Sequence, residues 1–558
     1  MKKAIFTLAF LIAGIVSYAQ TAYDALNLGS TDYEGTARTV AMGNAFTALG
    51  GDPGSITINP AGSAVAGYSQ ISFTPSLTFS TNTTQGVSPY NDGSLPYFDR
   101  KMKSGMTRFD IPNFAVTLDW ETGRKRGVKN VTVGFVMNKT KGWNEDVYAN
   151  GLNSTTSFMG ELAAATTLLM ADYNASLLPG EAPYTDYDLT GNEAYDYMPW
   201  KNVVGYQSGM ISTFGGYDDE FVGASEAIYH NPHTGMDEIT LAGTLDQTYG
   251  RKVIGNRYDY AFNIGANISD FLYIGANLGF SSLEYDYNEY FKEAAVDPND
   301  FVIDMADGAS MCFKNMKYNY SYKVTGTGVY AQVGFILTPI AGLRIGGAIK
   351  TPTSNTIIEE WRMSGSTEFS DSRYNSSASS PYGEDKYTLV TPMNANLGLA
   401  YTFGSFGVIS ADYEICNYGT MKYKGHSDSR DYFMAVNEEI QSMFGTRHTF
   451  RTGLEVKPIS NIAIRAGYNI SGSGEKYTSW GEALDPVFTQ NVSFGLGYSS
   501  KGSFYTDLAV RKTFVPKEYF MPYDDYIFND KGNITTYSPE ILNKQSLWKV
   551  FLTFGWRF

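Results

Sequence analysis

Cysteine is almost absent from this sequence, which has only Cys312 and Cys416 in 558 residues. Exported proteins that depend on disulfides use many more, and these two lie outside any metal-ligand spacing. We expect two isolated small residues, with a single bridge as the alternative. Long apolar runs are also missing beyond residue 20, which excludes a transmembrane helix. The net charge of −15 argues against nucleic-acid binding, which requires basic patches.

The first nineteen residues have the pattern of a secretory signal peptide. Lys2 and Lys3 precede an apolar run that ends at Val16, and Ser17-Tyr18-Ala19 fits the small-x-small cleavage rule. Cleavage there makes Gln20 the first residue of the mature chain. No cysteine follows the cleavage site, so a lipoprotein anchor is not expected.

The rest of the chain is dominated by alternation with a period of two. Apolar residues at 71, 73, 77 and 79 alternate with Ser and Thr at 72, 74, 76, 78 and 80. Six further pairs of such segments are joined by short turns, and a last segment ends the chain, giving about 14 strands. Long connections separate the pairs, the longest at about 139–257. Short turns on one side and long loops on the other are typical of outer-membrane barrels.

We therefore predict an all-β fold, a transmembrane antiparallel β-barrel over residues 69–558 in the outer membrane of a Gram-negative bacterium. The apolar positions would face lipid, and the polar positions a wet lumen. Arg or Lys at mid-depth on the lipid face costs about 2–4 kcal/mol. The charged residues predicted to face inward are Arg344, Lys350, Arg451, Glu455, Arg465, Asp507, Arg511 and Lys549. A soluble β-sandwich fits this pattern less well.

The final strand is apolar on one face and ends at Phe558. A terminal aromatic strand of this kind resembles the signal by which the barrel-assembly machinery recognises outer-membrane barrels. This machinery and membrane lipid are therefore expected partners of the chain.

Residues 20–68 do not have the alternating pattern of the barrel strands. A short helical pattern stops at Gly50-Gly51, and Asp52-Pro53-Gly54 and Asn59-Pro60-Ala61-Gly62 follow as turns. Because this compact segment leads directly into the first strand, we expect it to lie inside the lumen as a hatch.

On these residues the sequence resembles the FadL/TodX (OmpP1-like) family of outer-membrane transporters. The matching segments are the hatch pattern with Asn59, Pro60 and Ala61, followed by "LRIGGAIKTPTS", "TPMNANLGLAYTFGSFGVISADYE" and "IAIRAGYNISGSGEK". The resemblance implies passive uptake of hydrophobic molecules such as long-chain fatty acids, gated by the hatch, in a monomer without enzyme activity or cofactor. It also implies a lateral opening at a kinked strand. The family places that kink in the third strand, and Pro75 in the first strand is a candidate equivalent here.

The longest loop departs from the family, in which the ligand-capture helices follow other strands. It contains a predicted helix with Phe158, Leu162, Leu169 and Tyr173 near one face. These residues are either the core of the loop or a groove that contacts the ligand.

Three other functions remain open at this point. A general diffusion porin requires an open channel, which the hatch opposes. A receptor for haem or another hydrophobic ligand is suggested by His230 and His233, although no further ligands accompany them. A Ser–His hydrolase would most readily use His448, but nothing marks its serine.

Overall fold

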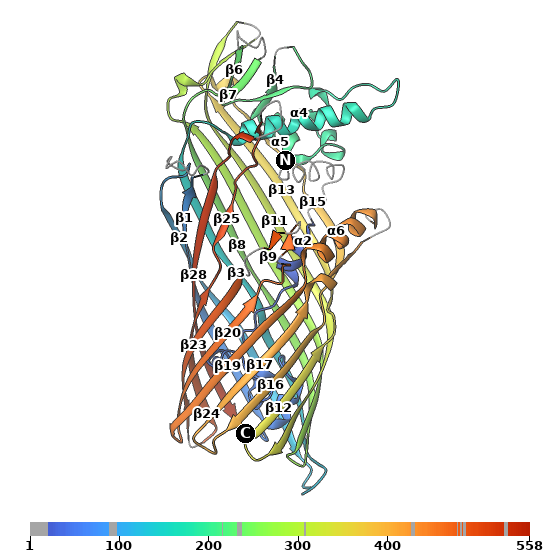
Figure 1. Cartoon of the computed structure of the whole chain (residues 1–558), viewed down its shortest axis with the longest axis vertical. Helices are drawn as coiled ribbons and strands as arrows, with labels where there is room; N and C mark the ends of the chain where they lie inside the picture. The colour runs from blue at the N-terminus through green and yellow to red at the C-terminus, as the bar shows by residue number, and fades with distance from the viewer. Residues whose placement is uncertain are drawn as a thin grey trace.

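The computed structural model describes residues 20–558 except 89–96, 215, 231–236, 306–307, 426–429, 477, 480–481, 484–486, 501 and 529–533. Fourteen antiparallel strands form a closed barrel, and β1 (Gln70–Val87) pairs with β28 (Glu540–Arg557) to complete the ring (Figure 1). The predicted fold class is confirmed, and this is the architecture of an outer-membrane barrel. Among the described residues, no helix is both long and apolar enough to cross a membrane.

The wall strands follow one another around the ring in chain order. After β1 they are β2 (Met102–Glu121), β3 (Val128–Asn153), β8 (Leu245–Ile268), β9 (Leu272–Ala295), β11 (Ser310–Ile340), β12 (Leu343–Lys350) continued by β13 (Ser354–Phe369), β15 (Gly383–Val390) continued by β16 (Asn394–Thr402), β17 (Gly407–Asn417), β19 (Thr446–Ile459), β20 (Ile462–Gly472), β23 (Phe488–Ser499), β24 (Phe504–Phe514) and β28.

Burial along the strands follows the predicted alternation. On β1, Phe73, Leu77 and Phe79 are exposed on the outside, whereas the Ser and Thr residues between them are buried. The eight charged residues predicted to face inward all do so. Seven are buried, and the partly exposed Arg344 donates to a hatch carbonyl. The barrel therefore presents lipid with apolar side chains and keeps its charges in the lumen.

The strands on one side of the barrel extend far beyond the membrane belt, the zone in which apolar side chains cover the outside of the wall. β3 runs to Asn153 and β8 begins at Leu245, so the predicted connection 139–257 is shorter than the sequence indicated. Hydropathy alternation is lost above the belt because both faces of a strand are then wet, and the sequence pattern therefore ends early. The remaining loop contains α4 (Phe158–Ser176), α5 (Trp200–Gln207) and the short strands β4 (Ile211–Thr213), β5 (Phe221–Gly223), β6 (Glu226–His230) and β7 (Asp237–Leu241).

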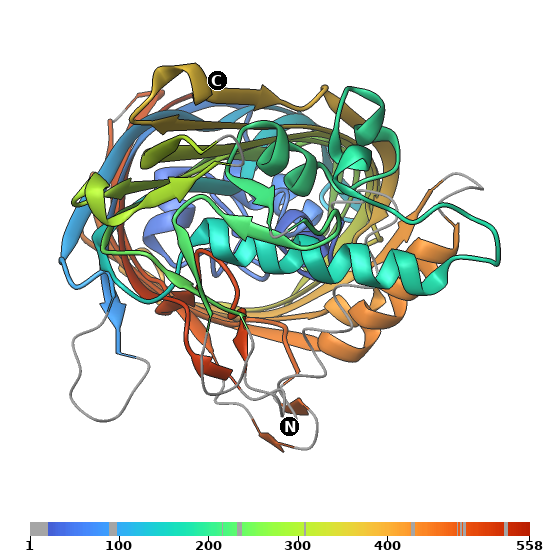
Figure 2. The ribbon, with the colours of Figure 1, turned by 90° about the horizontal axis from the view of Figure 1, so that it is seen from above.

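The opposite side of the wall is much lower. β19, β20, β23 and β24 have 11–14 residues, whereas β3, β8, β9 and β11 have 24–31. Above the membrane belt the wall is thus a half-cylinder. Figure 2 shows α4 crossing its mouth, and α6 (Arg430–Met443) lies at the low side.

Candidate functional site

The N-terminal segment fills the lumen as a chain of short helices and turns (Figure 2). It comprises α2 (Ala22–Gly29), α3 (Ala37–Ala41), η1 (Pro53–Ser55) and η2 (Pro60–Val65). Thr21, Thr36, Asp52 and Asn59 cap these elements by accepting hydrogen bonds from backbone N–H groups. Most residues of the segment are buried although they contribute no strand to the wall. The capping residues explain why such short helices form here.

Asn59, Pro60 and Ala61 lie where this segment meets the wall. The Asn59 side chain is fully buried, and its Nδ2 donates to Thr47 O at 2.6 Å and to Phe335 O of β11 at 3.0 Å. Its Oδ1 accepts from Ala61 N at 3.1 Å. Asn59 therefore closes the local turn and ties the segment to a wall strand. A role in gating stays a prediction.

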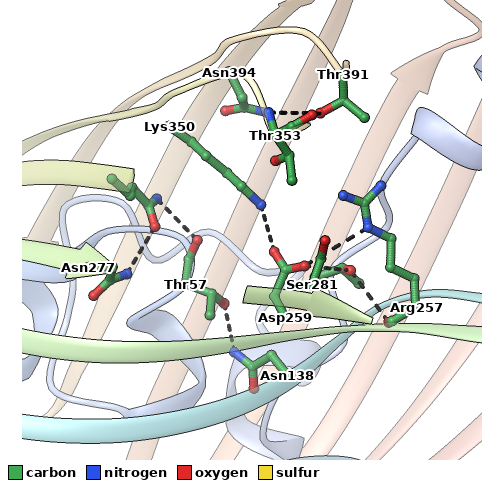
Figure 3. Close-up of polar contacts among 12 residues, drawn as sticks. Thr57, Asn138, Arg257, Asp259, Asn277, Ser281, Lys350, Thr353, Thr391 and Asn394 are labelled. Carbon is green, nitrogen blue, oxygen red and sulfur yellow. Dashed lines mark hydrogen bonds and ion pairs between the residues drawn. The ribbon is translucent and has the colours of Figure 1, made fainter. Parts of the chain in front are cut away.

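Inward-facing amides of the wall hold the backbone of the same segment. Asn138 Nδ2 donates to Thr57 Oγ1 at 2.7 Å (Figure 3), and Asn277 Nδ2 donates to Ile56 O at 2.9 Å. Gln332 donates to two further hatch carbonyls. Each donor satisfies an oxygen atom that would otherwise be buried without a partner, which stabilises the hatch in one position.

Glu34 is the charged centre of the contact between hatch and wall. It accepts from Arg511 Nη2 at 2.9 Å and from Lys549 Nζ, and Lys139 Nζ lies 3.8 Å away. Lys139 also donates to Asp110 Oδ2 at 2.8 Å. Burial alone raises the pKa of Glu34, but Lys549, Lys139 and Arg511 outweigh it and hold that pKa below its ordinary value. Both hydrogen bonds reach Oε1, and Oε2 has only the more distant Lys139 ammonium as its partner among the described residues.

A second network lies nearer the periplasmic end. Arg38 of α3 pairs with Glu455 of β19 at 2.9 Å, and Glu455 also pairs with Arg465 of β20 at 2.6 Å. Arg465 in turn contacts Asp507 of β24 at 2.5 Å. Both ends of the hatch core are thus held by buried charges, an arrangement in which removal of one partner is costly.

A third network ties the end of α2 to the wall, and Figure 3 shows its wall residues Lys350, Asp259 and Arg257. Lys350 Nζ contacts Asp259 Oδ2 at 2.6 Å, and Arg257 Nη1 donates to Leu28 O at 3.2 Å. At the same level, Thr353 N donates to Thr391 Oγ1 at 3.2 Å and Thr391 N to Thr353 O at 2.9 Å. These two bonds keep the neighbouring strands paired beside Pro352 and Pro392, which have no N–H group to donate.

Two cavities lie on either side of the hatch. The outer one has a volume of about 530 Å³ and is lined by α2 and by residues of β3, β19, β20 and β23, including Lys141 and Arg451. The inner one has a volume of about 350 Å³ and is lined by Arg38, Asp52 and Glu455 among others. Arg451 and Glu455 belong to the same strand, so the two cavities lie at different levels of the barrel, and residues of the hatch line both.

The wall has a long break between β2 and β3. Their pairing ends at Asn113 with Asn138, although both strands continue outward. An extra residue, Thr140, interrupts the pairing of β3 with β8 at this level. Beyond it, the ladder that the described strands give β3 is the one with β8. The carbonyl oxygens of β3 accept there from side chains of β1, and Asn82 Nδ2 donates to Asp146 O at 3.0 Å. β3 has therefore moved to the lumen side of the β1–β2 hairpin.

Pro75 marks a smaller irregularity. The register of β1 against β2 shifts between Thr74 and Ser76, and neither Thr74 nor Pro75 pairs with β28. Both ladders resume at Ser76. The principal break thus lies between β2 and β3, and Pro75 lies opposite Ile111 and Pro112, where β2 has one residue more than β1. Participation of Pro75 in an opening stays a prediction.

The helical stripe predicted in the long loop is found on α4. Phe158, Leu162 and Leu169 are buried, and Tyr173 is half-buried beside Tyr184. Phe158 stacks on Phe291 with ring centroids 5.3 Å apart. These four side chains pack into the core of the loop, and none of them lines either of the two cavities.

The remaining candidate residues are placed as follows. Cys312 and Cys416 are both free thiols. His448 Nδ1 contacts the hydroxyl of Tyr413 at 2.5 Å on the outer wall, and its partner is therefore a tyrosine. The His230 side chain and His233 lie outside the described residues.

No family model matches the sequence, and no curated protein matches it. Among solved structures, a FadL homologue of Pseudomonas aeruginosa is 11% identical, with 95% of this chain and 100% of that chain covered and a TM-score of 0.50. The chain has the FadL/TodX-type fold. The toluene transporter TodX of P. putida is 12% identical over 94% of this chain and 99% of its own, with a TM-score of 0.47. TbuX, the toluene transporter of Ralstonia pickettii, is 12% identical over 95% and 99%, with a TM-score of 0.44.

Proposed function

We propose that the protein is a passive channel through which hydrophobic small molecules, such as long-chain fatty acids, cross the outer membrane of a Gram-negative bacterium. The observation that carries the proposal is a direct contact between the hatch and the place where the pairing of β2 with β3 ends. The backbone of Glu34 in the hatch pairs with that of Lys139, one residue before the bulge at which β3 leaves β2. The similarity of the fold to a FadL homologue supports the same conclusion.

In this proposal the long loop and α4 form the entrance, and the cavity of about 530 Å³ receives the molecule above the hatch. Movement of the hatch away from Lys139 opens the break between β2 and β3 from the inside. An apolar molecule that leaves sideways enters lipid directly. It thereby avoids exposure to the periplasm, which costs about 25 cal/mol per Å² of apolar surface.

No energy source is required, because transfer of an apolar molecule into lipid is itself favourable. The residues assigned to the gate are Glu34, Lys139, Asn59, Pro60 and Ala61. Their contacts either join the hatch to the wall or fix the turn that does so. We assign no catalytic group, and the buried charges serve to position the hatch.

The alternative is a general diffusion porin, and the test must distinguish it from a channel for hydrophobic molecules. Polar residues line much of both cavities, as a porin would require, but the hatch lies between them. Protein purified from outer membranes should carry co-purifying apolar molecules that mass spectrometry of a lipid extract identifies. A deletion of residues 21–62 serves as the matched control and should retain far less. Equal, non-selective lipid in both proteins would contradict the proposal.

A further inference from the structure

The first residue of the predicted mature chain is buried within the upper barrel. In the full chain Gln20 has no solvent exposure, and its carbonyl oxygen accepts from the Tyr432 hydroxyl at 2.5 Å. Its side-chain Nε2 donates to Glu359 Oε2 at 2.7 Å and to Asp385 Oδ2 at 3.2 Å. Chain ends are usually exposed and poorly ordered unless something holds them. Here the two carboxylates of the wall hold the end of the hatch.

Glu359 and Asp385 accept from neutral groups in the part of the chain that the structure describes. Glu359 is fully buried and accepts from the hydroxyls of Tyr322, at 2.5 Å, and Tyr387. Within the described part of the chain, no ion pair includes Glu359, Asp385 or the nearby Asp24. A buried carboxylate that is solvated only by neutral donors is expensive compared with one that also has a counter-ion.

A second observation indicates a missing donor at the same place. The side-chain Oε1 of Gln20 is buried and has no hydrogen-bond partner among the described residues. Native proteins seldom leave a buried polar atom in this state. A group with several N–H donors and a positive charge would satisfy both this oxygen and the carboxylates.

Hydrolysis of the Ala19–Gln20 peptide bond supplies such a group. Water adds across the bond, Ala19 leaves with a new carboxylate, and Gln20 keeps a new α-amine that is protonated as an ammonium with three donors. We propose that Glu359 and Asp385 form the binding site for the α-ammonium of mature Gln20. Signal-peptide removal thereby completes a buried ion pair that fastens the leading end of the hatch to β13 and β15.

The same contacts affect cyclisation, a side reaction of N-terminal glutamine. In cyclisation the α-nitrogen attacks the side-chain carbonyl carbon, ammonia leaves, and a neutral lactam forms. That reaction would consume the α-ammonium and also remove Nε2, the atom that donates to Glu359 and Asp385. The site therefore selects uncyclised glutamine in the folded protein.

The test uses mature protein purified from outer membranes, with folding checked by heat-modifiable migration. Mass spectrometry should give an N-terminus at Gln20 without loss of ammonia. The probe is 2-pyridinecarboxaldehyde, which labels free N-termini. It should react at least about tenfold more slowly with the folded than with the denatured protein, since reaction requires local opening. A different N-terminus, a lactam or equal labelling rates would overturn the proposal.

Two variants separate the ion pair from burial alone. Glu359→Gln keeps the shape but removes the charge and should speed labelling of the folded barrel, whereas Glu360→Gln, at an exposed neighbouring position, should not. Inserting Ser-Gly after Ala19 moves the α-ammonium away and should speed labelling equally. The insertion combined with Glu359→Gln should add nothing, because both changes break one interaction. Unchanged labelling in Glu359→Gln, or full additivity, would contradict the assignment.

Discussion

The backbone N–H of Glu34 donates to the carbonyl oxygen of Lys139 at 2.8 Å, which joins the hatch to the strand at which the wall loses its ladder. The two side chains belong to one buried network with Asp110, Arg511 and Lys549. A change in the hatch position must therefore alter the surroundings of the wall break. This physical connection underlies the predictions that follow.

Removal of the Glu34 charge should loosen the hatch. Glu34→Gln leaves Arg511 and Lys549 buried near a neutral group, and breaking a buried ion pair typically costs about 3–5 kcal/mol. We expect hydrogen exchange in residues 30–50 to accelerate while the wall strands stay protected. Asp32→Asn is the control, because the Asp32 carboxylate is 44% exposed and pairs with Arg511 alone. Equal exchange in both variants would remove Glu34 from the anchoring of the hatch.

The hatch should block ions as well as ligands. Deleting residues 21–62 while keeping the signal peptide removes no wall strand, so the barrel should still assemble. Its conductance in planar bilayers should greatly exceed that of the intact protein, since the two cavities would become one continuous channel. Conductance equal to that of the full chain would show that the segment does not occlude the lumen.

Asn59→Ala should alter uptake of a hydrophobic substrate. The substitution removes the donor to Thr47 O and Phe335 O, and an unsatisfied buried acceptor costs about 1–3 kcal/mol. A less firmly held gate should admit substrate at a changed rate in cells with normal barrel levels. Unaltered uptake would leave Asn59 as a turn residue only.

The break beside β3 should matter more than the irregularity at Pro75. Deleting Thr140 removes the residue that β3 has in excess of β8 beside the break, and we expect the straightened β3 to extend its ladder with β2 and close the opening. Uptake should fall without loss of heat-modifiable barrel. Pro75→Val restores a single ladder donor and should reduce uptake less. A larger effect of Pro75→Val would move the opening to the seam between β1 and β28.

The extracellular loop should become less stable as pH rises. Burial raises the pKa of Glu226 from its ordinary 4.5 to about 7, although Gly223 N–H and the Tyr526 hydroxyl partly oppose this. The folded loop therefore binds the proton more tightly than the open loop does. It should lose up to about 3 kcal/mol between pH 4.5 and 7, at about 1.4 kcal/mol per pKa unit. Proteolysis of the loop should accelerate over this range, and Glu226→Gln should weaken the dependence, with the remainder due to Glu293, which accepts from Phe158 N–H of α4.

The wall could be predicted from the sequence because a strand between lipid and water must alternate. The six predicted pairs of wall strands are all present, and Lys549 and Arg511 point inward as their positions require. Strand ends could not be predicted, since hydropathy carries no signal once both faces are wet. This is why β3 and β8 extend beyond the predicted limits.

The site was only partly predictable, for a related reason. The Asn-Pro-Ala turn is visible as local chemistry, but Phe335, to which Asn59 donates, lies 276 residues away. Glu34 is one of 57 acidic residues, and nothing in the sequence distinguishes it from the others. Only the closed ring brings Lys139, Arg511 and Lys549 around it. The break between β2 and β3 begins at Pro112, the residue before Asn113, which has no N–H to donate to a continued ladder.

The most direct test of the account is uptake through a barrel whose hatch can be locked reversibly. A Cβ on Gly29 would lie 3.6 Å from Cγ2 of Thr391, so cysteines at both positions can bridge after modest adjustment. In a background with Cys312→Ser and Cys416→Ala, Gly29→Cys/Thr391→Cys should form the bridge on oxidation. The hatch would then be fixed at its leading end by the bridge and at its other end by β1. The measurement is the uptake of radiolabelled oleate by cells that lack their own fatty acid channel. The account predicts uptake by the reduced protein, loss on oxidation and recovery on reduction. Undiminished uptake by the fully oxidised protein would contradict it.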